Sequence, residues 1–273
     1  MENRLADLGC ATLIVKVFRG LAEGVFGGGY CSISGEDESL FYWFVGTDDW
    51  ASRPTVVWSN GGPGSSSFWG FFTENGPYVV EDADTPKLSV RETAWNKDVN
   101  YLMIEHPLSV TLSFAKDAAN IPANVEAGTV QYYQALLNII AKHPEIKNNP
   151  LVLAGESYAG TVQEVMEGED GLRMIIVSGL NDAKDCNFLG TGAWLELLEG
   201  TSAARFEEAD TVPWVETNAP VPYLGSVQDG ATTAGGIDKE GGKLAWVKVM
   251  NAGHLAVGDQ PLLLGKLREL GEF

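Results

Sequence analysis

The sequence predicts an α/β fold in which a mostly parallel central sheet is flanked by helices. Two observations support this prediction: strands of the buried type recur along the chain, and amphipathic helices fall between them. The strands are apolar runs that each end in small or polar residues, at 54–60, 99–107, 150–157, 172–182 and 243–254. Nearly continuous apolar strands are typical of a parallel sheet that is covered on both faces.

Three segments between or after these strands have helical character. Residues 123–142 are predicted to form a helix that ends before Pro144. Their apolar side chains recur at roughly a 3.6-residue spacing, at Val125, Val130, Tyr133, Leu136, Leu137 and Ile140. Residues 191–198 and 262–270 indicate two further helices.

The ends of the strand pattern are less regular. Tyr30–Ser34 and Leu40–Val45 are rich in aromatic and β-branched residues, and the turn-like run between them predicts a hairpin at the start of the fold. The polar, glycine-rich stretch 225–242 is typical of a surface loop or a hairpin tip. Neither an internal repeat nor a linker interrupts the chain, so we expect one domain.

Composition excludes several classes of function. The 18 Lys and Arg residues face 37 Asp and Glu residues, and the resulting net charge of −19 disfavours nucleic acid as a partner. The cysteines Cys10, Cys31 and Cys186 lack metal-ligand spacing, so neither a disulfide framework nor a metal site is indicated. Because every apolar run falls short of about 18 residues, no membrane span is expected. We expect the signal peptide at the start of the sequence to be degenerate or missing.

The run GESYAG at 155–160 predicts a catalytic nucleophile, Ser157. It follows an apolar strand and precedes a predicted helix, and its small residues permit a tight strand-to-helix turn that exposes the serine hydroxyl. A serine hydroxyl is a weak nucleophile and needs a general base, which a third group must orient. We therefore expect an acid and a histidine farther along the chain.

Three histidines can be compared as that base. His143 lies at a helix end before a proline, where a structural role suffices. His106 lies upstream of Ser157, against the expected order of nucleophile, acid and base. His254 follows the last predicted strand, which favours it as the base.

The acid should follow a strand between Ser157 and His254. Asp182 and Asp185 both come after the apolar run at 172–180. Asp182 is nearer the strand end and is preferred, while Asp185 remains an alternative.

The glycine-rich run WSNGGPGSSS at 58–67 follows another predicted strand. Glycines let backbone N–H groups approach a developing oxyanion, together with the amide of Tyr158 after the nucleophile. A phosphate loop is disfavoured because the lysine of that motif is missing.

These motifs together resemble the serine carboxypeptidase family, the group of carboxypeptidase Y and cathepsin A. The resemblance rests on LFYWF at 40–44, WSNGGPGSSS, ENGP at 74–77, KNNPLVLAGESYAG, DCNFLGTGAW and NAGHLAVGDQP. It begins near Gly29, which implies a single α/β-hydrolase domain over 29–273 after an atypical N-terminal segment, 1–28. It also implies a secreted, vacuolar or lysosomal location and no cofactor.

The resemblance assigns site residues as well. It implies Ser157 and His254 as catalytic residues and the amides of Gly62 and Tyr158 as the oxyanion hole. It further implies that peptide or protein C-termini are the substrates. Their free carboxylate would be bound by Asn60, Gly61, Glu74 and Glu156.

One departure from the family concerns the segment after the nucleophile. Only a short stretch separates Ser157 from the strand that starts near Arg173, where family members carry a helix, a strand and a large helical insertion. We expect the chain to lack most of that insertion and one strand. An inactive carboxypeptidase-like protein, and an esterase or acyltransferase using the same triad, remain alternative functions.

Overall fold

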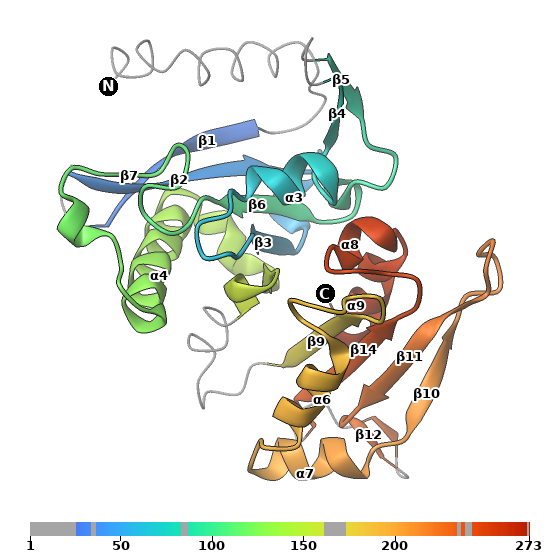
Figure 1. Cartoon of the computed structure of the whole chain (residues 1–273). Helices are drawn as coiled ribbons and strands as arrows, with labels where there is room; N and C mark the ends of the chain where they lie inside the picture. Colours follow the sequence, from blue (N-terminus) through green and yellow to red (C-terminus); the bar gives the residue numbers. More distant parts are fainter. Residues whose placement is uncertain are drawn as a thin grey trace. The chain divides into compact units, whose positions relative to one another are not determined.

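The computed structural model describes residues 26–33, 37–82, 87–160, 173–233, 236–237, 242–271 and 273. It divides into two compact units, Met1–Met166 and Glu167–Phe273, and each is described by itself. Figure 1 labels their helices and strands. The atypical segment 1–28 lies mostly outside the described residues, and the expected single domain over 29–273 stays a prediction.

The first unit is built on a mixed sheet. Its strand order is β1-β2-β6-β3-β8, and a short strand, β7, pairs with β2. The pairs β1–β2 and β2–β6 are antiparallel, whereas β6, β3 and β8 run parallel. The predicted hairpin and the three predicted strands of this unit are confirmed. The strands are β1 (Phe26–Ser32), β2 (Glu38–Val45), β3 (Thr55–Ser59), β6 (Asn100–Ile104), β7 (Phe114–Ala115) and β8 (Leu151–Gly155).

One long helix, α4 (Val125–Lys142), packs against this sheet. Asn124 caps its start, because the Asn124 Oδ1 accepts a hydrogen bond from the Ala127 amide at 2.9 Å. The buried face of α4 joins Leu102 and Val57 of the sheet in one core cluster. The helix is confirmed, but its buried face is not the predicted stripe: Val130, Tyr133 and Leu137 are exposed.

Several shorter elements of the first unit were not predicted. The helix α3 (Phe68–Thr73) follows the glycine-rich loop after β3, and Glu74 is its C-cap residue. A separate antiparallel hairpin follows it, formed by β4 (Tyr78–Asp82) and β5 (Lys87–Val90). Single 3₁₀ turns occupy Trp50–Ser52, Trp95–Lys97, Ala118–Asn120 and Pro144–Asn148.

The second unit has its own sheet, in the order β10-β11-β14-β9. Strands β14 and β9 are parallel, and β10 and β11 extend the sheet antiparallel. Its strands are β9 (Met174–Gly179), β10 (Thr211–Val215), β11 (Tyr223–Asp229) and β14 (Leu244–Val249), beside a small hairpin of β12 (Thr232–Thr233) and β13 (Gly236–Ile237). The predicted strands β9 and β14 are confirmed.

Helices cover the two faces of that sheet with two separate cores. Val247 and Val249 of β14 pack with Leu263 and Leu270 in one cluster, while Leu244 and Trp246 pack with Leu195 and Phe206 in the other. Successive side chains of a strand point to opposite faces, which explains the division. The helices are α6 (Phe188–Leu195), α7 (Thr201–Glu208), α8 (Ala256–Asp259) and α9 (Leu263–Gly271).

Two sequence predictions for this unit need correction. Gly225–Asp229, expected in a surface loop or a hairpin tip, lies in β11, where a Cβ on Gly225 would stand 1.9 Å from the Lys248 carbonyl oxygen. That glycine therefore permits a close strand approach. The helix expected at 191–198 begins at Phe188 instead, because the Asn187 side chain caps it through the Gly190 amide at 2.8 Å.

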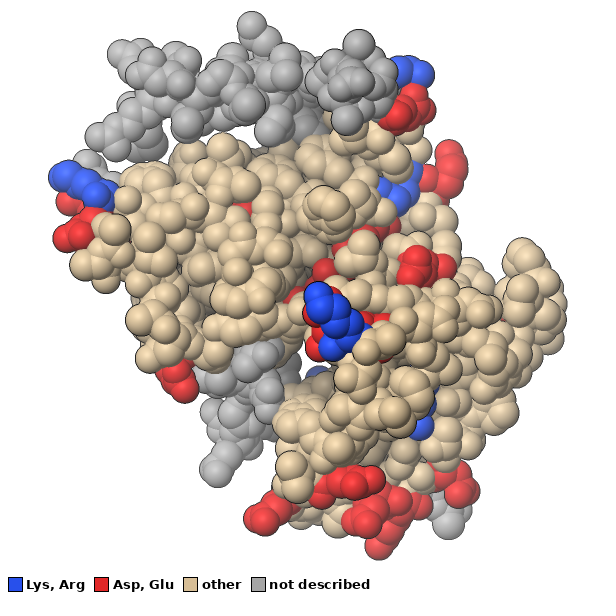
Figure 2. Space-filling model, in the orientation of Figure 1, with Lys and Arg blue, Asp and Glu red and all other residues tan. Residues whose placement is uncertain are grey.

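The acidic composition is visible on the surface. Acidic side chains gather over α6 and α7 (Figure 2), where Glu196, Glu199, Glu207 and Glu208 are exposed. Every helix in the described part of the chain falls short of the length and apolarity needed to cross a bilayer.

Candidate active site

Ser157 lies in a strained turn at the end of β8. Its backbone φ is 57°, in the left-handed region that residues other than glycine rarely adopt. The Glu156 amide donates to the Ser59 carbonyl at 3.1 Å, and the chain enters a helical turn at Tyr158. Such strain, about 1–3 kcal/mol, persists only where surrounding contacts enforce it. The turn has the strand-to-helix context that the GESYAG motif predicts.

The glycine-rich loop after β3 rests against this turn. A Cβ on Gly61 would stand 2.5 Å from the Tyr158 amide nitrogen and 2.6 Å from the Glu156 carbonyl oxygen, so only glycine fits there. The Ser67 Oγ anchors the loop, accepting from the Asn60 amide at 3.1 Å and donating to the Ile104 carbonyl at 2.7 Å. The structure thus brings the backbone of the two expected oxyanion segments together.

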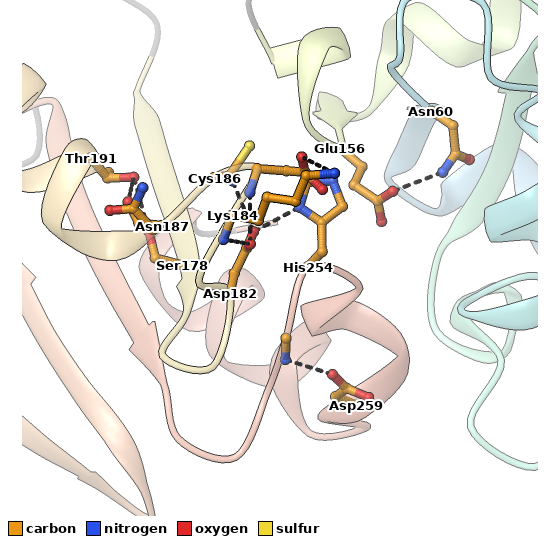
Figure 3. Close-up of polar contacts among 12 residues, drawn as sticks. Asn60, Glu156, Ser178, Asp182, Lys184, Cys186, Asn187, Thr191, His254 and Asp259 are labelled. Carbon is orange, nitrogen blue, oxygen red and sulfur yellow. Dashed lines mark hydrogen bonds and ion pairs between the residues drawn. The ribbon is translucent and has the colours of Figure 1, made fainter.

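Asn60 is buried with a fixed amide orientation. Its Oδ1 accepts hydrogen bonds from the Trp58 indole at 2.9 Å and from the Gly70 amide at 3.1 Å. The Nδ2 group therefore points the other way and donates to the Glu156 Oε1 at 3.0 Å, as Figure 3 shows. Asn60 and Glu156, which are distant in the sequence, meet beside the nucleophile turn.

The buried carboxyl groups of Glu74 and Glu156 interact, and a hydrogen bond between them contributes to the pKa of Glu156. Two ionised carboxylates offer only acceptors, so this hydrogen bond requires a proton on one of them. Burial raises the pKa of Glu156, and its hydrogen bonds with Glu74 and Asn60 act in the opposite direction. Glu74 is only 3% exposed, and a buried pair of this kind retains a shared proton above the ordinary carboxyl pKa.

In the second unit, Asp182 follows β9 and His254 follows β14. The Asp182 Oδ2 lies 2.7 Å from the Nδ1 of His254 (Figure 3). Oδ2 also accepts from the Cys186 amide at 3.0 Å, while Oδ1 accepts from the amides of Asp185 at 3.1 Å and Lys184 at 3.3 Å. Burial acts to raise the pKa of Asp182, but these hydrogen bonds, that of His254 foremost, hold it below its ordinary value.

The loops carrying Asp182 and His254 are held against each other. The Asn181 amide donates to the Ala252 carbonyl at 2.8 Å, and a Cβ on Gly179 would stand 2.1 Å from the Gly253 carbonyl oxygen. The Asp259 Oδ2 accepts from the Gly253 amide at 2.7 Å. Sequence reasoning assigned no role to Asp259, although it belongs to the NAGHLAVGDQP run.

The remaining candidates have structural contacts. Asp185 is exposed, and its nearest cation is the Lys184 Nζ at 3.7 Å. His106 is buried and donates from Nε2 to the Gly128 carbonyl at 3.0 Å; burial lowers the pKa of His106 to about 4. His143 stacks on Phe44 and contacts the Tyr42 hydroxyl at 3.3 Å.

One group of described residues has ligand types suited to a metal ion. Potential ligand atoms of Asp182, Cys186 and His254 lie within 4.8 Å of one another. Both Asp182 oxygens, however, already accept hydrogen bonds from the surrounding loop and from His254. The arrangement therefore favours an acid–base pair over a metal centre.

Comparison with known proteins agrees with the motifs. The model of the serine carboxypeptidase family matches residues 25–167 and 161–266. The lysosomal protective protein of Mus musculus is 39% identical over 133 residues, which cover 48% of this chain and 27% of the mouse protein. Carboxypeptidase Y homolog A of Phaeosphaeria nodorum is 37% identical over 202 residues, or 66% of this chain and 35% of the fungal protein.

These alignments span about a third or less of the relatives' own length. Among solved structures, a prohormone-processing carboxypeptidase from Saccharomyces cerevisiae matches with a TM-score of 0.69 at 14% identity, covering 91% of each chain. That likeness shows the fold, which is the predicted α/β-hydrolase fold. Because the family model matches most of the sequence, the chain belongs to the serine carboxypeptidase family.

Proposed function

We propose that the chain is a serine-type carboxypeptidase that removes C-terminal residues from peptides or proteins. One observation carries the proposal beyond family membership: the buried carboxyl groups of Glu74 and Glu156, with Asn60, gather beside the turn that carries Ser157. A buried carboxyl that keeps its proton can donate a hydrogen bond to an anion, and a free C-terminus is a carboxylate.

In the proposed reaction, the Ser157 Oγ attacks the carbonyl carbon of the last peptide bond. The His254 Nε2 takes the hydroxyl proton, while the Asp182 carboxylate fixes the tautomer with the proton on Nδ1. The amides of Gly62 and Tyr158 stabilise the oxyanion of the tetrahedral intermediate. His254 then returns the proton to the departing amino group, leaving an acyl-enzyme.

Water completes the proposed cycle. His254 removes a proton from a water molecule, the resulting hydroxide attacks the acyl carbon, and Ser157 regains its proton as the ester bond breaks. No cofactor enters these steps. The substrate is selected by Asn60, Gly61, Glu74 and Glu156, which bind the carboxylate of the residue being removed.

Labelling with a fluorophosphonate probe tests whether the proposed triad assembles. We expect mass spectrometry to find the adduct on Ser157 in the wild-type chain, and to find labelling abolished in Ser157→Ala and strongly reduced in His254→Ala. A folded wild-type chain that does not react would contradict the proposal and favour an inactive member of the family.

Substrate comparison tests the reaction class. A carboxypeptidase should cleave an N-blocked peptide with a free C-terminus and should cleave its C-terminal amide much more slowly. Equal rates on both peptides, or cleavage of simple esters alone, would favour an esterase or acyltransferase with the same triad.

We further propose that the protein acts in a secreted, vacuolar or lysosomal location. The name of the mouse relative, lysosomal protective protein, supports this location. Fractionation of cells expressing the tagged full chain tests it: recovery in the cytosol alone would contradict the proposal.

A further inference from the structure

Arg91 follows β5 and fastens the segment that carries Glu74. Its Nη2 donates to the Phe72 carbonyl at 2.6 Å and to the Tyr78 carbonyl at 3.4 Å, and its Nε donates to the Gly76 carbonyl at 3.0 Å. These acceptors lie on both sides of Glu74 in the sequence. The planar, half-buried guanidinium of Arg91 therefore fixes the backbone conformation on both sides of Glu74.

The same guanidinium acts on Glu74 through its charge. Burial lowers the pKa of Arg91, and the negative charge of Glu74 opposes that effect, which places the two groups in direct electrostatic interaction. Glu156, the other member of the pair, instead has the neutral Asn60 amide as its hydrogen-bond donor. The positive charge of Arg91 thus interacts with Glu74, whereas Glu156 is hydrogen-bonded by an uncharged donor.

Among the described residues, Tyr101 is another titratable group that interacts with this pair. Its hydroxyl donates to the Asn75 Oδ1 at 2.7 Å, and burial raises its pKa well above the ordinary value. Tyr101 therefore stays neutral when the carboxyl pair titrates. Arg91 supplies the fixed charge.

We propose that Arg91 is a positioning residue of the carboxylate-binding site: it holds the segment that carries Glu74, and its charge lowers the pH at which the pair of Glu74 and Glu156 loses its shared proton. This inference rests on the proposed function, because the carboxyl pair is there the hydrogen-bond donor to the substrate carboxylate. A nearby positive charge favours the ionised form of a carboxyl group, so the pair gives up its shared proton at a lower pH than it would alone.

Two substitutions separate the charge of Arg91 from its shape. Arg91→Gln removes the charge and should raise the pH midpoint for loss of the shared proton by about one unit. Arg91→Lys keeps the charge but loses the planar guanidinium. The pH midpoint for loss of the shared proton should therefore stay within a few tenths of a pH unit of wild type, while the segment carrying Glu74 is held less firmly. Arg53→Gln is the matched control, since Arg53 is an exposed arginine paired with Asp49 at 2.8 Å.

The direct readout is an NMR titration of the full chain with ¹³C-labelled Glu carboxyls, with Glu156→Gln used to assign the pair. A higher midpoint in Arg91→Gln, but not in Arg91→Lys or Arg53→Gln, would support the proposal. An unchanged midpoint in a folded Arg91→Gln chain would overturn it. If Arg91→Gln does not fold, a midpoint in Arg91→Lys displaced by a full unit would overturn it equally.

Kinetics supply a second readout that a purely structural role would not move. For a peptide with a free C-terminus, KM should rise with pH as the shared proton is lost, and in Arg91→Gln that rise should begin about one unit higher. At a given pH above both midpoints, KM divided by its low-pH value should then be about tenfold smaller in Arg91→Gln than in wild type. A shifted NMR midpoint in a chain that hydrolyses no peptide would support the role of Arg91 and contradict the proposed function.

Discussion

His254 donates from Nδ1 to the Asp182 Oδ2 at 2.7 Å, and both residues stand at the ends of adjacent parallel strands. Because the pKa of Asp182 is held below its ordinary value, its carboxylate is ionised and can only accept. The Nδ1 atom of His254 must therefore carry a proton. In the neutral imidazole this leaves the lone pair on Nε2, the atom that a general base uses.

Replacing Asp182 tests this relationship. Asp182→Asn should lower kcat by about 10⁴-fold, because an amide can stabilise the wrong tautomer and cannot stabilise the imidazolium form. Peptide hydrolysis and the rate of fluorophosphonate labelling both measure the effect. Asp185→Asn, three residues away and exposed, is the control and should keep activity within about threefold. The reverse ranking would transfer the role of the acid to Asp185.

Replacing Glu156 tests the shared proton. Burial raises the pKa of Glu156 in the folded state, so its neutral form is favoured there, and the free energy of unfolding should fall as pH rises from the unfolded pKa through the folded one. Glu156→Gln cannot ionise and still donates a hydrogen bond. It should remove both this loss of stability and the pH dependence of KM between about pH 4 and 8.

Thermal unfolding and steady-state kinetics across that pH range measure the two effects. Glu126→Gln, an exposed substitution in the first turn of α4, should change neither profile by much. A KM for free C-termini that varies with pH as strongly in Glu156→Gln as in wild type would assign the dependence to another group.

Gly61 should tolerate no side chain. In Gly61→Ala the new methyl group would meet the backbone of Tyr158 and Glu156 at 2.5–2.6 Å, and backbone atoms cannot move aside as a flexible side chain can. The loop must withdraw from the nucleophile turn, which should lower kcat by at least 10²-fold through loss of an oxyanion donor. Gly265→Ala, in open space on α9, should instead stabilise the chain by about 1 kcal/mol.

The sequence motifs predicted the positions of the candidate residues at strand ends better than periodicity predicted the buried faces. Ser157, Asp182 and His254 follow apolar strands in a fixed order, and strand ends are where an α/β fold places its functional groups. In α4, by contrast, Val130, Tyr133 and Leu137 were assigned to the apolar stripe but are exposed, while Tyr132 and Ile139 are buried. Apolar residues occur on more than one side of that helix, so spacing alone does not identify the face that meets the sheet.

Residues that act through contacts distant in sequence escaped prediction. Arg91 binds carbonyl groups up to 19 residues away, and no local pattern marks a side chain that pairs with backbone atoms. Asp259 lies in the motif NAGHLAVGDQP, but the sequence alone gave no indication of its contact with the Gly253 amide. Gly225 was taken for a loop residue, because the close strand approach that requires it depends on the neighbouring strand β14.

Asp259 provides a test of how the His254 loop is held. Its Oδ2 accepts the Gly253 amide, the residue before the proposed base, at 2.7 Å. Asp259→Ala removes the acceptor and should lower kcat by about tenfold with little change in KM, whereas Asp259→Asn retains an acceptor oxygen and should recover most of the activity. A one-dimensional proton spectrum provides a check independent of turnover, because the Nδ1 proton between His254 and Asp182 should give a low-field signal that weakens in Asp259→Ala. If that signal and kcat are both unchanged in a folded Asp259→Ala chain, the loop is held by its other contacts, such as the hydrogen bond between the Asn181 amide and the Ala252 carbonyl.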